Sequence, residues 1–324
     1  MRSLSNPDII VVGASAGGVD ALRKLAAGLP PGLEGAVFVV LHTLATGENL
    51  LPHILSRAGP LPAVEPQDGT LFEIGKIYTA PPDRHLMLHD GSLRVVRGPR
   101  ENRHRPSIDV LFRSAATAFG PRVAAVLLSG SDDDGTAGML AVKKSGGVAI
   151  VQDPADSDHP EMPASALRAA DPDFKLPATE IGPLLRNLVD GRIRPPRTEA
   201  RIEAAEKSFG QEEGSPTDIK QLGTPTSFSC PDCNGTLWEL QDGNLLRYQC
   251  RVGHAYTWES VVEAESDAVE RALWSAVRTL EESAALSRRV AQRTGLLEQE
   301  MARKAAEREE HARVIRHLLL EGSA

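Results

Sequence analysis

Short apolar runs alternate with amphipathic segments in the first part of the chain, up to about residue 190. The apolar runs are rich in β-branched residues and predict strands, whereas the longer segments carry apolar residues three and four positions apart and predict helices. The predicted strands are Ile9–Val12, Ala36–Leu41, Lys76–Thr79, His85–Leu88, Leu93–Val96, Val123–Ser129 and Val148–Gln152. The predicted helices are Val19–Gly28, Glu48–Arg57, Ser107–Phe119, Gly135–Ser145 and Glu180–Leu188.

This alternation predicts an α/β fold with a doubly wound, mostly parallel sheet. Continuously apolar strands, such as residues 124–128, are typical of a parallel sheet that helices cover on both faces. Ligands of such sheets bind at the carboxyl ends of the strands. The region from residue 76 to 96 departs from the alternation and predicts an antiparallel ribbon, with its turn at Asp90 and Gly91.

The composition of the chain changes after residue 190, where Pro and Gly interrupt a charged stretch. We expect a linker there, with a short helix at Glu199–Lys207. A compact module that holds all the cysteines follows, and then a long helix with a break near Gly295. The predicted domains are 1–190, the linker 191–225, the cysteine module 226–258 and the helical segment 259–324.

The helical segment carries small or apolar residues at near-heptad spacing, which indicates one buried stripe. We expect this stripe to pack against the cysteine module or an antiparallel helix. Self-association or a helical partner is the alternative. The stripe consists of Val262, Val269, Leu273, Ala276, Leu280, Ser287, Val290 and Leu297.

The three cysteines are close together and are accompanied by a histidine. Cys230 and Cys233 form a C-x-x-C pair, and Cys250 and His254 form a C-x₃-H pair after a spacer of hairpin length. A turn signal at residues 242–244 divides the spacer. Three sulfurs and one imidazole at this spacing predict a structural zinc site of the Cys₃His type. A redox-active thiol pair or three free thiols are the alternatives.

The overall charge and composition exclude several classes of function. The net charge of -8 and the aromatic content of 4% argue against nucleic-acid binding. No stretch is long and apolar enough to insert into a membrane, and the first residues lack the apolar core of a secretory leader. We therefore expect a cytoplasmic protein.

A serine occupies a glycine-rich turn between the first predicted strand and the first predicted helix. The residues from Gly13 to Gly17 fit G-x-S-x-G, with Ser15 at the centre. Small neighbours allow a sharp turn that presents the serine hydroxyl at the end of the sheet. A phosphate-binding glycine turn is the alternative, although the chain lacks the lysine that follows the glycines of a phosphate-binding loop.

Two other predicted strands end in residues that a catalytic serine requires. His42 follows the second strand, and Asp132, Asp133 and Asp134 follow the strand that ends near Ser129. Because the carboxyl ends of parallel strands meet at one edge, these side chains are expected to lie near Ser15. The aspartates would otherwise cap the next helix or bind a metal.

Residues 8 to about 189 resemble the catalytic domain of the bacterial chemotaxis protein-glutamate methylesterases. The chain has the family's motifs in the family's order and approximate spacing. The matching stretches are Gly13–Gly18, His42, Ala80–His85, Asn102–Phe112, Ser129–Met139 and Met162–Pro163.

The resemblance implies a Ser-His-Asp triad that hydrolyses glutamyl methyl esters on chemoreceptors and requires no cofactor. Ser15 would be the nucleophile, His42 the base and Asp134 the residue that orients it. Asp134 is preferred because the family's aspartate directly precedes the glycine that matches Gly135. Backbone N–H groups near Ala16 and Ser131 would stabilise the oxyanion. The same chemistry would allow deamidation of glutamine.

The chain departs from the family pattern in two places. The family has Gly-Met-Gly where this chain has Gly130-Ser131-Asp132, which changes the pocket and places a second carboxylate near Asp134. We expect this charge to raise the pKa of one of the two carboxyl groups. Many family members also carry a receiver domain, whereas the first strand here begins at Ile9, so regulation by such a domain in cis is not expected.

The basic run Arg103-His104-Arg105 is expected in or near the cleft, whereas a solvated loop is the alternative. His85 and His104 are interpreted as structural or substrate-adjacent rather than catalytic. The predicted function is thus a serine esterase acting on methylated chemoreceptor-type proteins. The alternative is a catalytically degenerate adaptor that binds partners through its zinc and helical segments.

Overall fold

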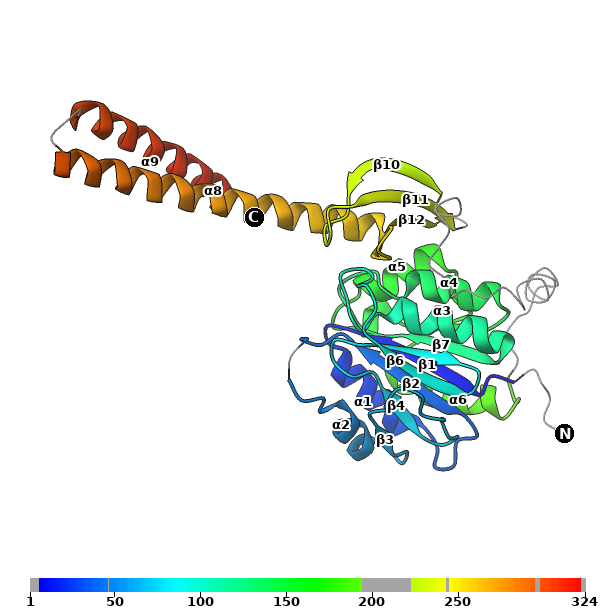
Figure 1. Cartoon of the computed structure of the whole chain (residues 1–324). Helices are drawn as coiled ribbons and strands as arrows, with labels where there is room; N and C mark the ends of the chain where they lie inside the picture. Colours follow the sequence, from blue (N-terminus) through cyan, green and yellow to red (C-terminus); the bar gives the residue numbers. More distant parts are fainter. Residues whose placement is uncertain (1–5, 46, 194–222, 243–244, 295–297, 322–324) are drawn as a thin grey trace. The chain divides into compact units, whose positions relative to one another are not determined.

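A parallel sheet of seven strands forms the centre of the first part of the protein (Figure 1). The computed structural model describes residues 6–45, 47–193, 223–242, 245–294 and 298–321. The strand order is β3-β4-β2-β1-β7-β8-β9, and every neighbouring pair is parallel. The strands are β1 (Ile9–Ala14), β2 (Ala36–Leu41), β3 (Ala63–Val64), β4 (Ile77–Thr79), β7 (Val123–Leu127), β8 (Val148–Gln152) and β9 (Phe174–Leu176).

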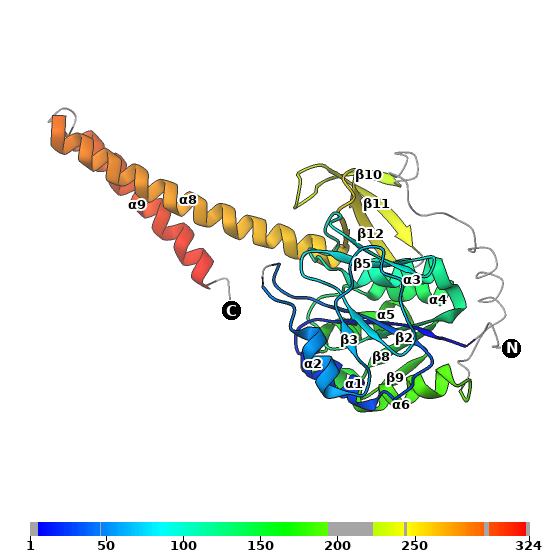
Figure 2. The ribbon, with the colours of Figure 1, turned by 60° about the horizontal axis from the view of Figure 1, so that its bottom comes forward.

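Helices cover both faces of the sheet, as the apolar strands predict (Figure 2). One apolar core lies between the sheet and α1 (Gly18–Gly28), α2 (Leu51–Ala58) and α6 (Ala178–Val189). The other core lies between the sheet and α3 (Ile108–Phe119), α4 (Thr136–Lys144) and α5 (Glu161–Ala169). Alternate residues of β1 enter opposite cores: Ile10 and Val12 face α1, whereas Ile9 and Val11 face α3.

The predicted doubly wound α/β class is therefore observed, with a correction at the region from 76 to 96. Only β5 (His85–His89) and β6 (Ser92–Val96) form an antiparallel ribbon, and its turn is at Asp90 and Gly91. β4 instead pairs in parallel with β2 in the main sheet. Its three residues are too few to show the continuous apolar run of a central strand. The short elements β3, α5 and β9 were not predicted.

The strand order changes direction beside β1, which positions the functional site. β1 lies between β2 and β7, so the chain first builds one side of the sheet and then returns to the other. Ala14 pairs with Leu41, and Gly13 pairs with Leu127, so the three strands end at nearly the same level. The loops after β1, β2 and β7 therefore meet at the point where open α/β sheets bind ligands.

The cysteine module is a four-stranded antiparallel sheet with the order β10-β11-β12-β13. Its strands are β10 (Thr224–Ser229), β11 (Thr236–Asp242), β12 (Leu245–Cys250) and β13 (Ala255–Thr257). Asp242 pairs with Leu245, so a two-residue connection joins β11 to β12 at the predicted hairpin. Residues 243 and 244 themselves, and the predicted helix at Glu199–Lys207, lie outside the described residues.

The chain divides into two compact units, Met1–Ser260 and Val261–Ala324. The second unit contains most of α8 (Trp258–Thr294) and all of α9 (Glu298–Glu321), and the predicted break near Gly295 lies outside the described residues. Ion pairs such as Arg316–Glu281, at 2.6 Å, join the two helices. No helix of the described residues is long and apolar enough to cross a membrane.

The buried stripe of the helical unit differs from the predicted one. Val262, Val269 and Val290 are exposed, whereas Ser287 is buried as expected. Leu273, Ala276 and Leu280 are half-buried, and Leu297 lies outside the described residues. The buried positions are mostly alanines at heptad spacing, because small side chains let two helices approach closely. This stripe consists of Val277, Ala284 and Ala291 on α8 and of Ala305 and Ala312 on α9.

Candidate active site

Ser15 lies in the turn between β1 and α1. Gly17 adopts a left-handed conformation with φ at 70°, which reverses the chain within the turn. A Cβ atom at Gly17 would lie 2.7 Å from Ser129 Oγ, so glycine is required for space as well as for conformation. The Ser15 N–H donates to the Ser129 carbonyl at 2.9 Å. The serine turn is thereby tied to the end of the neighbouring strand β7.

His42 connects Ser15 to Asp134 through two hydrogen bonds. His42 Nδ1 lies 3.1 Å from Ser15 Oγ, and His42 Nε2 lies 2.9 Å from Asp134 Oδ2. Because an ionised carboxylate only accepts, Nε2 carries the proton and Nδ1 is free to accept one from the serine. The structure thus brings together three residues that sequence reasoning selected at the ends of three strands.

Asp134 is fully buried at the N-terminus of α3, where five donors surround its carboxylate. Helix N-termini favour such a charge because their first N–H groups have no partner within the helix. Oδ2 accepts from Ile108 N at 2.6 Å as well as from His42. Oδ1 accepts from Asn102 Nδ2, Ser107 Oγ and Asp109 N, at 3.1, 3.0 and 3.2 Å.

These contacts set the protonation states that a triad requires. Burial by itself would raise the pKa of Asp134, but the His42 hydrogen bond and the N–H donors outweigh burial and hold this pKa well below its usual value. Burial lowers the pKa of His42 and exceeds the opposing effect of Asp134. At neutral pH the pair is therefore a carboxylate beside a neutral imidazole, which is the state of a general base.

Asn102 and Asp109 form a second layer behind Asp134. Asn102 Nδ2 donates to Asp134 Oδ1 and to Asp109 Oδ2, at 3.1 and 3.0 Å. Asp109 Oδ1 accepts from the backbone N–H groups of Gly135 and Gly138. Burial and the charge of Asp134 raise the pKa of Asp109 to about 7. Sequence reasoning quoted Asn102–Phe112 only as a family motif and gave these two residues no role.

The three consecutive aspartates have different environments, so they do not form one metal site or cap α4. The N-terminus of α4 receives no side-chain hydrogen bond from its cap residue, Gly135. Asp133 instead accepts from Ser260 Oγ at 3.0 Å, and burial raises its pKa to about 6. Asp132 lies 2.7 Å from His104 Nε2, a bond that lowers the pKa of Asp132.

We expected the charge of Asp132 to raise the pKa of either Asp132 or Asp134, and this expectation is wrong. The pKa values of Asp132 and Asp134 are both lowered, because each carboxylate has its own histidine partner. His104 lies against the ring of His42 and separates the two negative charges with a second imidazole. Among the described residues, His42, His104 and Asp132 also form one of two groups whose ligand atoms could hold a metal ion.

The predicted oxyanion region lies beside Ser15 and is bordered by a buried methionine. In the described part of the chain, the backbone N–H groups of Ala16 and Ser131 donate to no protein acceptor. Ser131 is exposed, and its hydroxyl lies 3.2 Å from His159 Nδ1. A Cβ atom at Gly130 would lie 2.5 Å from Met162 Cε and 2.9 Å from Ser15 Cβ. Met162 therefore packs against Gly130, next to Ser15.

The other polar residues of the basic run and its surroundings have structural partners. His85 Nε2 lies 2.8 Å from the Pro99 carbonyl, and its Nδ1 accepts from Ser107 N. Arg105 donates to Asp83 through Nε and Nη2, at 2.9 and 2.6 Å. These contacts fix the loop that leads into α3, which agrees with the structural interpretation of His85.

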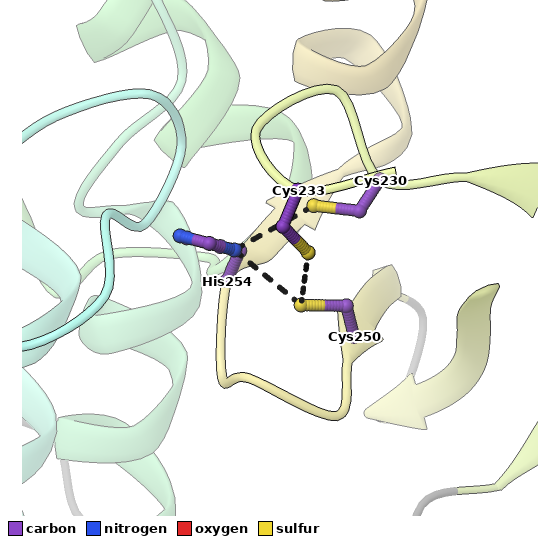
Figure 3. A group of neighbouring side chains, drawn as sticks. All are labelled: Cys230, Cys233, Cys250 and His254. Carbon is purple, nitrogen blue, oxygen red and sulfur yellow. Dashed lines mark hydrogen bonds between the residues drawn. The ribbon is translucent and has the colours of Figure 1, made fainter. Parts of the chain in front are cut away.

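The four predicted metal ligands also lie together (Figure 3). Cys230, Cys233, Cys250 and His254 each direct one ligand atom into a common space, and these atoms all lie within 4.8 Å of one another. Cys230 and Cys250 are buried, whereas Cys233 is exposed.

Comparison with known proteins identifies the family. The family model described as CheB methylesterase matches residues 10–185, which is more than half of the chain. The chain belongs to the CheB methylesterase family. The match includes Ser15, His42 and Asp134, together with the second-layer residues Asn102 and Asp109.

Similar proteins cover the same part of the chain. A protein of Leptospira interrogans, provisionally named a protein-glutamate methylesterase/protein-glutamine glutaminase, is 33% identical over 184 residues, which are 56% of this chain and 95% of that one. A protein of the same name from Anaeromyxobacter dehalogenans is 36% identical over 184 residues. These residues are 56% of this chain and 51% of that relative, so the chain spans about half of its length.

A solved structure supports the fold of the CheB methylesterase domain. The CheB methylesterase catalytic domain of Thermotoga maritima matches with a TM-score of 0.54 and 30% sequence identity. The match covers 56% of this chain and 98% of that structure. The chain is therefore a hydrolase-family member whose first domain has the fold of a CheB catalytic domain.

Proposed function

We propose that this protein hydrolyses the γ-methyl esters of glutamate side chains on a chemoreceptor-type protein. The observation that supports the proposal is the hydrogen-bonded series Ser15, His42 and Asp134 inside a domain of the CheB methylesterase family. The relatives named above carry the names of protein-glutamate methylesterases and protein-glutamine glutaminases. Deamidation of glutamine is therefore a second reaction of the same site.

In the first half of the reaction, His42 activates the serine. His42 Nδ1 takes the proton of Ser15, and Oγ attacks the ester carbonyl carbon. Asp134 stabilises the resulting imidazolium and holds the ring in the tautomer that leaves Nδ1 available. His42 then gives the proton to the leaving oxygen, so methanol departs and an acyl-serine remains.

Backbone N–H groups stabilise the negative charge that develops on the carbonyl oxygen. Ala16 and Ser131 supply these groups in the proposal, since neither N–H has a protein acceptor in the described chain. The loss of one such donor typically reduces kcat by about 10²–10³-fold.

In the second half of the reaction, water replaces methanol at the site. His42 accepts a proton from the water, the hydroxide attacks the acyl carbon, and Ser15 leaves with the proton that returns from His42. The product is a glutamate carboxylate on the substrate protein. With a glutamine substrate the same steps release ammonia in place of methanol.

A reagent that reacts with activated serines tests the proposed nucleophile without a receptor substrate. A fluorophosphonate is expected to modify Ser15 in the wild type and to modify neither Ser15→Ala nor His42→Asn. Ser266→Ala, which changes an exposed serine of α8, serves as the control and retains the label. Modification of folded Ser15→Ala at the wild-type rate would contradict the proposal and favour a degenerate adaptor.

A further inference from the structure

The ligand atoms of the cysteine module are spaced like the corners of a metal tetrahedron. His254 Nδ1 lies 3.6 Å from Cys230 Sγ and 3.4 Å from Cys250 Sγ (Figure 3). Cys233 Sγ lies 3.7 Å from Cys250 Sγ. Zinc–sulfur and zinc–nitrogen bonds of about 2.3 and 2.05 Å in a tetrahedron give sulfur–sulfur edges of about 3.8 Å and sulfur–nitrogen edges of about 3.6 Å. The observed separations match these edges.

The backbone holds both pairs of ligands in tight turns. The Cys230 N–H donates to the Gly235 carbonyl at 2.7 Å, and the Asn234 N–H donates to the Cys230 carbonyl at 2.8 Å. The second pair is closed in the same manner, since the Cys250 N–H donates to the His254 carbonyl at 3.0 Å. The turns leave the sulfurs at separations far beyond a disulfide bond length of about 2.05 Å.

Tyr256, two residues after His254, contacts the ligand Cys230 and the neighbouring Asp232. Tyr256 is fully buried, and its hydroxyl donates to Asp232 Oδ2 at 2.6 Å. The same hydroxyl oxygen lies 3.3 Å from Cys230 Sγ. Outer contacts of this kind orient metal ligands in proteins. The cluster thus has both the ligand set and the supporting layer of a structural site.

The strand that carries this tyrosine contacts the second layer of the active site. β13 begins at Ala255, directly after the ligand His254. The Ala255 carbonyl accepts from the Asn102 N–H at 2.8 Å, and the Thr257 N–H donates to Asn102 Oδ1 at 3.1 Å. Asn102 is therefore hydrogen-bonded to β13 through both its backbone and its side chain.

The bond from Thr257 determines which way the amide of Asn102 faces. Asn102 Oδ1 accepts from the β13 backbone, so Nδ2 must face the carboxylates of Asp134 and Asp109. A flipped amide would present its oxygen to two buried carboxylates and leave its N–H groups against a backbone donor. The position of β13 thus decides whether Asp134 receives this hydrogen bond.

We infer that Cys230, Cys233, Cys250 and His254 bind one zinc ion, and that the ion holds β13 where it positions Asn102 against Asp134. Asn102 acts as a positioning residue, since it contacts Asp134 rather than the reacting atoms. This second part rests on the proposed function, because it assigns Asp134 a place in the triad. The first part, zinc binding, is independent of the function.

Metal content tests the zinc site directly. The purified full chain, passed through a desalting column without chelator, is expected to contain one zinc ion per chain. Cys233→Ser replaces the exposed ligand and is expected to reduce the zinc content below one tenth of that value. Ser227→Ala, an exposed change on β10, is the matched control and retains the zinc. Wild-type protein with reduced thiols and no stoichiometric metal after incubation with zinc would overturn this part.

The rate at which a fluorophosphonate modifies Ser15 tests the positioning role. Removal of zinc from the wild type is expected to slow this rate at least tenfold, and added zinc is expected to restore it. Asn102→Ala is expected to be slow with or without zinc, because the connection is already lost. An equal loss on zinc removal in Asn102→Ala and in the wild type would overturn the coupling, as would no loss in the wild type.

The pH dependence of this rate distinguishes positioning from a general loss of structure. Asn102→Asp is expected to be the slowest variant, since it places a third carboxylate beside Asp134 and Asp109. Its modification rate is expected to depend on pH more steeply than that of Asn102→Ala. Identical pH profiles for the two variants would overturn the positioning role. Because no receptor is used, failure of methyl-ester hydrolysis would leave these measurements interpretable.

Discussion

The imidazole ring of His104 lies parallel to the ring of His42, with centroids 3.6 Å apart and planes inclined by 9°. Each ring has its own carboxylate, Asp132 for His104 and Asp134 for His42, at 2.7 and 2.9 Å. The imidazole of His42 is therefore held at its edge by Asp134 and on one face by a second ring. The residue that binds His104 is Asp132, one of the three consecutive aspartates that follow β7.

The first prediction concerns this stacking. His104→Ala removes the ring that packs against His42 and is expected to lower kcat about 2–10-fold, in line with about 0.5–1.5 kcal/mol for a ring pair. His104→Phe keeps a stacked ring without the bond to Asp132 and is expected to retain more activity. Steady-state kinetics of methanol release provide the measurement. Equal activity of His104→Ala and wild type would show that the ring contact has no effect.

The second prediction concerns pH. His42 must be neutral to accept the serine proton, and burial places its pKa below the ordinary value of 6.5. Activity is thus expected to persist as pH falls below 6.5 and to be lost only when pH passes through the lowered pKa. His104 contributes to the lowering, so His104→Phe is expected to shift the acid limb of kcat/KM to higher pH. A wild-type limb above pH 6.5 would contradict the buried, neutral base.

The third prediction concerns the carboxylate of Asp134. Asp134→Asn keeps the shape but removes the charge that selects the histidine tautomer, and the corresponding change in a Ser-His-Asp protease lowers kcat about 10⁴-fold. The amide would also oppose donors such as Ile108 N, so the melting temperature is expected to fall. Asp132→Asn is the matched control and is expected to lose much less activity. Similar losses in the two variants would count against Asp134 as the orienting residue.

The fourth prediction separates two demands on the glycine of the serine turn. Gly17 and Gly32 have nearly the same φ, 70° and 73°, but only Gly17 has neighbours that a Cβ atom would strike. Gly32→Ala is expected to cost about 1–2 kcal/mol from the left-handed backbone alone. Gly17→Ala is expected to cost more in denaturant unfolding and to reduce Ser15 reactivity. Equal costs and unchanged reactivity would indicate that the turn tolerates a side chain.

Sequence reasoning located Ser15, His42 and the aspartates 132–134 because each ends or follows a strand of one parallel sheet, whereas the choice of Asp134 among the three came from the family resemblance. The register of β1 with β2 and β7 brings these ends to one level, and this relationship follows from topology alone. The partners of the triad were harder to find. Asn102 belongs to a loop between β6 and α3, and its bonds to Asp134 and to Thr257 depend on loop geometry that has no periodic signal.

The buried stripe of the helical unit was predicted only in part, for a different reason. Valines such as Val262 and Val269 gave the strongest apolar signal, but they are exposed. The buried positions, including Ala284 and Ala305, are alanines that pattern analysis weighs lightly. Close packing of two helices selects for small volume as well as for hydrophobicity, so a stripe chosen by apolar character alone includes exposed valines and misses buried alanines.

Methanol release from a methylated chemoreceptor tests the proposed activity most directly. The wild type and Ser15→Ala are compared on a receptor fragment whose glutamates carry labelled methyl esters, with circular dichroism to show that both proteins are folded. The wild type is expected to release labelled methanol, and Ser15→Ala is expected to release none above the spontaneous rate. Equal release by the two folded proteins, or no release by the wild type, would contradict the account.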